Sequence, residues 1–115
     1  MGVTTARTDR PPITPDGRYV VVRGRLWRAS NPALGDAARA GLVDALMAAR
    51  RAVGRARKDA DADAEHRAHV AVNVAKIGLG ERGPPWWTDD APDLNRVMVA
   101  NTSYAGWYAS LAEAA

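Results

Sequence analysis

The chain has 115 residues, enough for one domain with a modest core, and 47% of them are hydrophobic, as in ordinary globular proteins. It has no cysteine, which excludes disulfides, thiol catalysis and cysteine-ligated metals. The net charge is +3, yet residues 1–58 hold twelve basic and four acidic side chains, whereas residues 59–115 hold four basic and nine acidic ones. No apolar run approaches the roughly 18 residues of a membrane span, and the start lacks a signal-peptide-like segment. We therefore expect a soluble, cytoplasmic protein without membrane insertion.

The first third of the chain predicts a tail followed by a β-hairpin. Residues 1–12 are polar and aperiodic, which predicts a disordered tail and leaves 13–115 as a single small globular domain. Residues 14–17 read Thr-Pro-Asp-Gly, a turn sequence. The runs 19–22 and 25–28 are rich in β-branched and aromatic residues, so they predict two short strands around a tight turn at Arg23-Gly24.

The middle of the chain predicts an antiparallel pair of helices. The first should run from about Ala37 to Lys58 and the second from about Ala62 to Leu79, where Gly80 stops it. The second helix carries a regular row of small residues, which predicts a close approach of the two helices. That row comprises Ala64, Ala68, Ala71, Ala75 and Gly78, and a neighbouring apolar row comprises Val70, Val74 and Ile77.

The last third predicts an aromatic loop and two short helices. Residues 81–87 contain two prolines and two tryptophans, and one of the tryptophans should pack against the helical hairpin. Asp89 or Asp90 should cap a short helix that reaches about Val99. A final helix should place Tyr104, Trp107, Tyr108 and Leu111 on one face. The predicted fold class is α+β, mainly α, with an N-terminal β-hairpin, an antiparallel helical hairpin and two short C-terminal helices.

Two sequence blocks carry a resemblance. Residues 16–28 (DGRYVVVRGRLWR) and residues 81–96, which contain ERGPPWWTD and APDLNR, are similar to blocks of a group of short bacterial proteins. The similarity covers about residues 13–111. Some members of the group bear a Tol-type biopolymer-transport label, although this chain shows no membrane anchor of the Tol type. The resemblance implies no particular activity.

The aromatic loop and the segment after it form the first candidate site. Tryptophan can form the wall of a ligand pocket or anchor a protein interface, while carboxylates, amides and guanidinium groups orient the partner. A carboxylate pair there could also perform acid–base chemistry. The alternative is architectural, with aspartate capping a helix and tryptophan covering the helical hairpin. The candidate residues are Arg82, Trp86, Trp87, Asp89, Asp90, Asp93, Asn95 and Arg96.

The β-hairpin forms the second candidate site, for nucleic acid. Guanidinium groups contact phosphates and aromatic rings stack on bases. The alternative is a solvated strand face with Trp27 in the core. The candidate residues are Arg18, Arg23, Arg25, Trp27 and Arg28.

The helical hairpin offers two further clusters. A basic end of the first helix (Arg50, Arg51, Arg55, Arg57 and Lys58) precedes an acidic start of the second, as the helix dipoles favour; nucleic-acid binding by the basic end is the alternative. Glu65, His66 and His69 could approach a metal, but their spacing is not that of zincins, and a solvated polar face is favoured.

The function best supported by the sequence is a non-enzymatic binding or interaction module that uses the Trp/Asp/Arg-rich loop. Its partner would be a protein or a second copy of the chain, and no metal or cofactor is expected. The alternative is nucleic-acid binding through the Arg-rich hairpin. A small enzyme that uses the Asp-rich loop ranks third.

Overall fold

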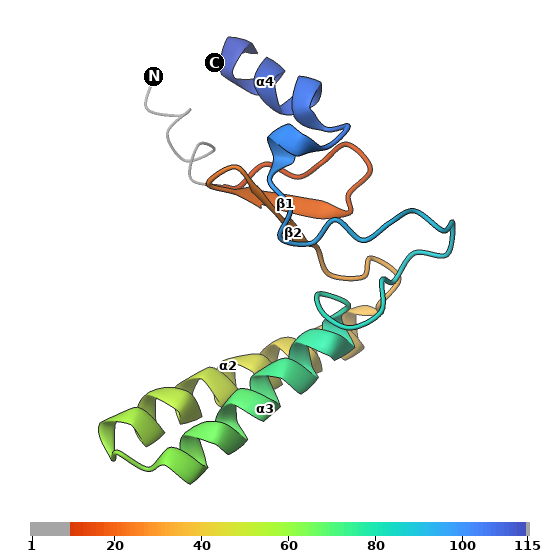
Figure 1. Ribbon diagram of the computed structural model, residues 1–115. Coiled ribbons are helices and arrows are strands. Elements are labelled where there is room, and N and C mark those ends of the chain that lie inside the picture. The colour runs from red at the N-terminus through yellow and green to blue at the C-terminus, as the bar shows by residue number, and fades with distance from the viewer. Residues whose placement is uncertain (1–9, 115) are drawn as a thin grey trace, which may run out of the picture. The chain divides into compact units, whose positions relative to one another are not determined.

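The computed structural model describes residues 10–114, so residues 1–9 of the tail predicted over 1–12 lie outside the described residues, whereas the Pro12 carbonyl at its end accepts a hydrogen bond from the Val21 amide. The element order is β1, β2, α2, α3, η1 and α4, which confirms the mainly helical α+β class (Figure 1). The chain divides into two compact units. The sheet unit combines residues 10–29 with residues 91–114, and the helical unit comprises residues 30–90. That residues 13–115 form a single domain stays a prediction.

The sheet unit is built on the predicted hairpin. β1 (Tyr19–Val22) pairs antiparallel with β2 (Arg25–Arg28), and Val22 lies opposite Arg25. The two-residue turn between them has φ of 54° at Arg23 and 78° at Gly24. Positive φ at both central positions is what a type I′ hairpin turn requires, and it matches the twist of the flanking strands.

The segment before η1 (Val99–Asn101) is not helical, although the sequence predicted a helix there, and it contains a turn at Asn95-Arg96. Its backbone pairs with β2: the Leu26 amide donates to the Val97 carbonyl at 2.9 Å, and the Arg96 amide donates to the Leu26 carbonyl at 2.7 Å. Met98 forms an antiparallel bridge with Arg25. The open edge of a two-stranded hairpin offers these hydrogen bonds, and they outweigh the local helix signal.

A fourth extended piece lies on the other edge. The Val21 amide donates to the Pro12 carbonyl at 2.9 Å, and Ile13 forms a bridge with Val20. One face of this small sheet is buried, and Tyr104 meets the Tyr19 ring edge-on with 5.9 Å between ring centroids. α4 (Ala105–Ala114) follows directly, as the predicted final helix. The buried residues of this face and of η1 are Thr14, Tyr19, Val21, Leu26, Arg28 and Val99.

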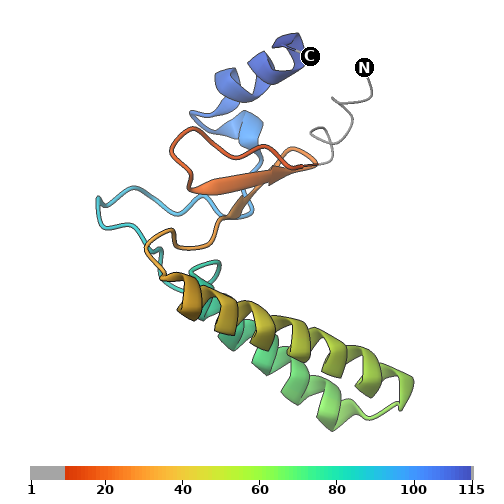
Figure 2. The same ribbon diagram turned by 180° about the vertical axis from the view of Figure 1, so that it is seen from behind.

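The helical unit is the predicted antiparallel hairpin of α2 (Asp36–Lys58) and α3 (Ala62–Leu79), which lie side by side in Figures 1 and 2. Its core cluster consists of Leu46, Ala75 and Leu79, with Leu34, Leu42 and Val72 packed against it. Asp61 caps α3 by accepting the Ala64 amide at 3.0 Å, and Gly80 ends it with φ of 88°. None of the described helices combines the length and apolar character that a membrane crossing requires.

Only some members of the small-residue row of α3 are buried. Ala68 and Ala75 are buried, but Ala71 is exposed. At Gly78 an added Cβ would lie 2.7 Å from a Leu42 methyl, so the two helices do approach closely there. The neighbouring row of Val70, Val74 and Ile77 is exposed, at 48%, 62% and 44%. On a helical wheel this row points away from α2, because its residues fall about half a turn from Ala68 and Ala75.

Candidate functional site

The face of the sheet opposite the buried one is apolar and exposed. Residues directly opposite one another in antiparallel pairs point to the same face. The pairing therefore creates two cross-strand rows, one of Ile13, Val20 and Trp27, the other of Val22, Arg25 and Met98. We call these six residues the outer sheet face.

Most of the large apolar side chains on the outer sheet face lie in contact with solvent. Ile13 is 58% exposed, Val22 and Trp27 are each 41% exposed, and Met98 is 37% exposed. A single exposed apolar residue is ordinary, but several neighbours on one face form a patch of the kind that marks interaction sites. The sheet thus has one buried face and one apolar face that is largely exposed to solvent.

Arginines accompany this face. The exposed Arg25 donates from Nη1 to the Arg96 carbonyl at 2.5 Å, which fixes its side chain along the sheet edge. Arg23 is exposed in the adjoining turn. The combination of tryptophan, methionine and arginine is the one enriched in protein interfaces.

The predicted nucleic-acid-binding residues of the hairpin do not lie on one surface. Arg23, Arg25 and Trp27 are exposed, whereas the Arg28 side chain is only 1% exposed and pairs with Asp93 at 2.9 Å. Arg28 follows Trp27 and so faces the opposite side of the strand. The alternative that placed Trp27 in the core is wrong, because the Arg28 side chain lies on the buried face and the Trp27 side chain lies on the exposed face.

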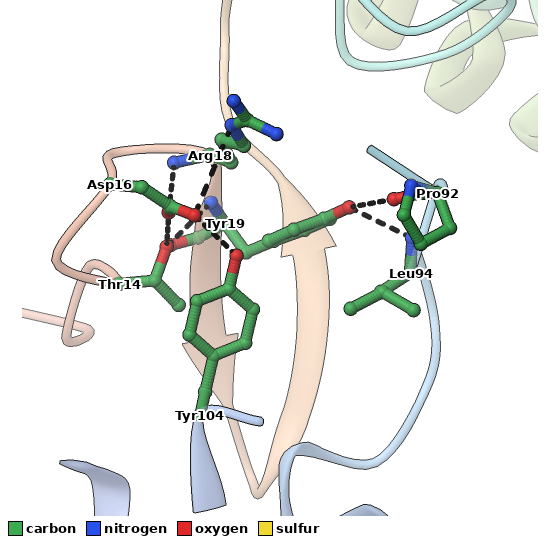
Figure 3. A network of polar contacts seen from close by, with 7 residues as sticks. All are labelled: Thr14, Asp16, Arg18, Tyr19, Pro92, Leu94 and Tyr104. Carbon is green, nitrogen blue, oxygen red and sulfur yellow. Dashed lines mark hydrogen bonds and ion pairs between the residues drawn. The ribbon is translucent and has the colours of Figure 1, made fainter. Parts of the chain in front are cut away.

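Arg18 lies beside a polar network that holds the buried side of the sheet (Figure 3). Asp16 accepts hydrogen bonds from the Thr14 hydroxyl at 2.7 Å and the Tyr104 hydroxyl at 2.5 Å, and its carboxylate lies 3.9 Å from Arg18. Burial opposes ionisation of Asp16, but the hydrogen bonds from Tyr104, Thr14 and the Arg18 amide, together with the Arg18 charge, outweigh it and lower the pKa of the carboxyl. Burial, followed by the bond to Asp16, raises the pKa of the Tyr104 hydroxyl.

The same network extends through Tyr19, which is fully buried. The Tyr19 hydroxyl accepts the Leu94 amide at 2.8 Å and donates to the Pro92 carbonyl at 3.4 Å. Burial is the main cause that raises the pKa of this hydroxyl. These bonds tie the segment before η1 to the sheet, so the network supports the architecture of the sheet unit.

The predicted Trp/Asp/Arg-rich site is divided between the two units. Asp93, Asn95 and Arg96 belong to the sheet unit, where their contacts are structural. Asp93 holds Arg28, while the Asn95 side chain accepts the Arg28 amide at 2.9 Å. Arg96 has φ of 74° and uses its backbone to pair with β2.

The remaining members of that predicted site belong to the helical unit. Arg82 donates to the Asn73 side chain at 3.1 Å, and the Trp86 and Trp87 rings meet edge-on with centroids 5.1 Å apart. An added Cβ on Gly80 would lie 2.9 Å from Trp86, so this ring packs on the C-terminal end of α3 as the sequence predicted. Asp89 and Asp90 are exposed.

The charged end of the helical hairpin offers no comparable site. Glu65 accepts from Arg57 at 3.1 Å and contacts His69 at 3.2 Å, and these two hydrogen bonds lower the pKa of the Glu65 carboxyl. Among residues 10–114 no three acidic or histidine side chains are grouped so that they could hold a metal ion. A groove of about 420 Å³ opens there, lined mainly by alanines of both helices together with Arg55, Arg67, Asp59 and Asp61.

Sequence reasoning did not identify Ile13, Val22 or Met98 as surface candidates. The signal for Val22 was available, because it shares a face with Trp27 once the tight turn fixes the register. Met98 was missed because its segment was predicted to be helical. Ile13 was missed because the sequence predicts it as the first residue of the folded part and does not assign it to a strand.

Comparison with protein-family models, curated protein sequences and solved structures finds no match to this chain. The resemblance to the group of short bacterial proteins therefore stays a prediction, and the function is inferred from the geometry.

Proposed function

We propose that this chain is a non-enzymatic binding module that recognises another protein through the outer sheet face. The observation that supports the proposal is the pair of exposed cross-strand rows, which contain Ile13, Val22, Trp27 and Met98. Tryptophan and arginine are the residues that most often act as energetic anchors in interfaces. Within the outer sheet face, Arg25 is the one ionisable side chain. Because arginine stays protonated, the face offers contact area and positive charge rather than acid–base chemistry.

This proposal keeps the predicted class and moves the surface from the Trp/Asp/Arg-rich loop to the sheet. Asp93 and Asn95 are engaged in holding Arg28 and β2, so they are poorly available to a partner. The cysteine-free composition fits a cytoplasmic protein, and cytoplasmic residence is part of the proposal.

Nucleic-acid binding is the second candidate, favoured by the shared exposure of Arg23, Arg25 and Trp27. Single-stranded nucleic acids stack successive bases on several aromatic rings and follow a positively charged groove. The outer sheet face supplies one ring, with aliphatic neighbours at Ile13, Val22 and Met98. Aliphatic side chains gain from apolar contact and give nothing to phosphates, so a protein partner is favoured.

Site-specific photo-crosslinking in cells tests the proposal. A benzophenone amino acid is placed at position 27 and, as a matched control, at position 74, which is 62% exposed on α3. We expect one or a few discrete protein adducts from position 27 that position 74 does not give. Adducts to nucleic acid alone, or identical patterns from both positions, would refute protein binding through this face.

A further inference from the structure

The charge around the outer sheet face is one-sided. The sheet unit has two acidic residues whose side chains the structure describes, Asp16 and Asp93, and both bond to groups of the buried side. Arg23 and Arg25 form no ion pair with an acid among the side chains that the structure describes. An apolar surface flanked by positive charge is complementary to an apolar surface flanked by carboxylates.

The dimensions of the face suit a helix. Each row crosses three extended segments, so it is about 9.6 Å long at the usual strand spacing, and the two rows lie about 6.8 Å apart along the strands. A helix rises about 10.5 Å from residue i to i+7, which is close to the length of one row. The width of its apolar stripe is similar to the distance between the two rows. An extended peptide of that length would direct just two side chains at the face, whereas a helix directs four, at i, i+3, i+4 and i+7.

The layering of the sheet points the same way. A sheet with two apolar faces is stable when a second layer covers each of them. Tyr104 lies against the buried face, and the outer sheet face has no such cover within the sheet unit. A helix from a partner would complete the layer.

We propose that the partner contributes an acidic amphipathic helix of at least two turns. Its apolar stripe covers Val22 and Trp27, and its flanking carboxylates pair with Arg23 and Arg25. This inference rests on the proposed function and names the chemistry of the partner.

Selection from a peptide library tests the inference. A displayed library of random 16-residue peptides is selected on the full chain, with depletion on a Val22→Ser/Trp27→Ser double variant. We expect enriched peptides with apolar residues at i, i+3 or i+4 and i+7, and with an excess of aspartate and glutamate beside them. The best synthetic peptide should be helical when bound, as measured by circular dichroism.

Matched variants then locate the peptide. Trp27→Ser should weaken binding about thirtyfold, as loss of an anchor does. Val22→Ser should weaken it several-fold, whereas Val74→Ser, an equally small change at an exposed valine of α3, should leave it unchanged. Proton–nitrogen correlation spectra verify that each variant is folded. Equal losses from Val22→Ser and Val74→Ser would overturn the proposed placement.

The charge is tested by reversal. An Arg23→Glu/Arg25→Glu variant should lose the acidic peptide and select lysine-flanked peptides from the same library. If that variant does not fold, the affinity of the wild-type chain for the acidic peptide should still fall as salt rises from 50 to 500 mM. Salt-independent binding would overturn the charge assignment.

Other outcomes identify a different occupant. Enrichment of peptides with period-two alternation would indicate an added strand, and binding to phosphatidylglycerol vesicles that Trp27→Ser abolishes would indicate a membrane surface. Either result overturns the helix. If no peptide is enriched but position 27 still crosslinks to a protein, the helix is wrong and the binding module stands. If position 27 gives no specific protein adduct, the proposed function itself is wrong.

Discussion

The pair formed by Arg28 and Asp93 predicts an asymmetric response to mutation. The Arg28 side chain is 1% exposed and the Asp93 side chain is 37% exposed, and Arg28 Nη1 lies 2.9 Å from Asp93 Oδ2. Removing one partner of a buried ion pair costs about 3–5 kcal/mol, whereas exposed pairs contribute at most about 1 kcal/mol. Asp93→Asn keeps the acceptor for the Asn95 amide but leaves a guanidinium that cannot lose its proton inside the sheet unit. We expect it to lower the free energy of unfolding by about 2–4 kcal/mol.

Replacing the arginine of this pair should lower the free energy of unfolding by less. Arg28→Met fills the same apolar space, and the Asp93 carboxylate, already partly exposed, regains water. We expect a loss of about 1 kcal/mol. The double variant Arg28→Met/Asp93→Asn should be no less stable than Arg28→Met, because the buried guanidinium is then absent. Asp44→Asn, at an exposed position of α2, serves as the control and should change stability by less than about 0.5 kcal/mol.

The measurement is urea denaturation followed through the indole resonance of Trp27, which reports on the sheet unit. An Asp93→Asn loss below about 1 kcal/mol would refute the reasoning, since it would mean that the buried guanidinium does not depend on this carboxylate. A larger loss from Arg28→Met than from Asp93→Asn would refute it equally.

Three further predictions concern other parts of the fold. Ala75→Leu should destabilise the helical unit by about 1–3 kcal/mol through overpacking, whereas the exposed Ala71→Leu should change its urea midpoint little; equal shifts would contradict the helix orientation. Gly54→Ala should stabilise α2 by up to about 1 kcal/mol, because a Cβ meets nothing within 4 Å and glycine is a poor helix former; a lower melting temperature would count against it. Tyr104→Phe should cost about 1 kcal/mol at pH 7 by removing a hydrogen bond to the partly exposed Asp16. The folded-state pKa of Asp16 is lowered, so the part of this contribution that comes from the carboxylate is complete above pH about 4 and is lost as pH falls through the folded value; a stability difference that does not shrink as Asp16 becomes protonated would contradict the assignment.

The local elements could be predicted because their signals are local. The strands 19–22 and 25–28 follow from β-branched residues around a turn that accepts positive φ, and their observed bounds agree with the prediction. The ends of α3 follow from an aspartate that caps it and a glycine that ends it. In each case the deciding interaction joins residues within a few positions of one another.

The candidate surface could not be predicted fully because it depends on pairing across the sequence. Residues 89–93 contain three aspartates and a proline, which favour a helix start, yet β2 provides backbone partners for the residues that follow, about 70 positions away. The position of Met98, and hence one end of the outer sheet face, depends on that pairing. Burial of Arg28 likewise depends on Asp93, which lies 65 positions away.

The order of the units along the chain has a consequence for folding. The helical unit is one continuous segment, whereas the sheet unit needs residues from both ends of the chain. During synthesis α2 and α3 can therefore fold through local contacts while β1 and β2 still lack the segment that pairs with them. A two-stranded hairpin alone is marginally stable in water. The hairpin should remain unstructured on the ribosome until residues 94–99 emerge, and its valines and Trp27 are available to molecular chaperones during that interval.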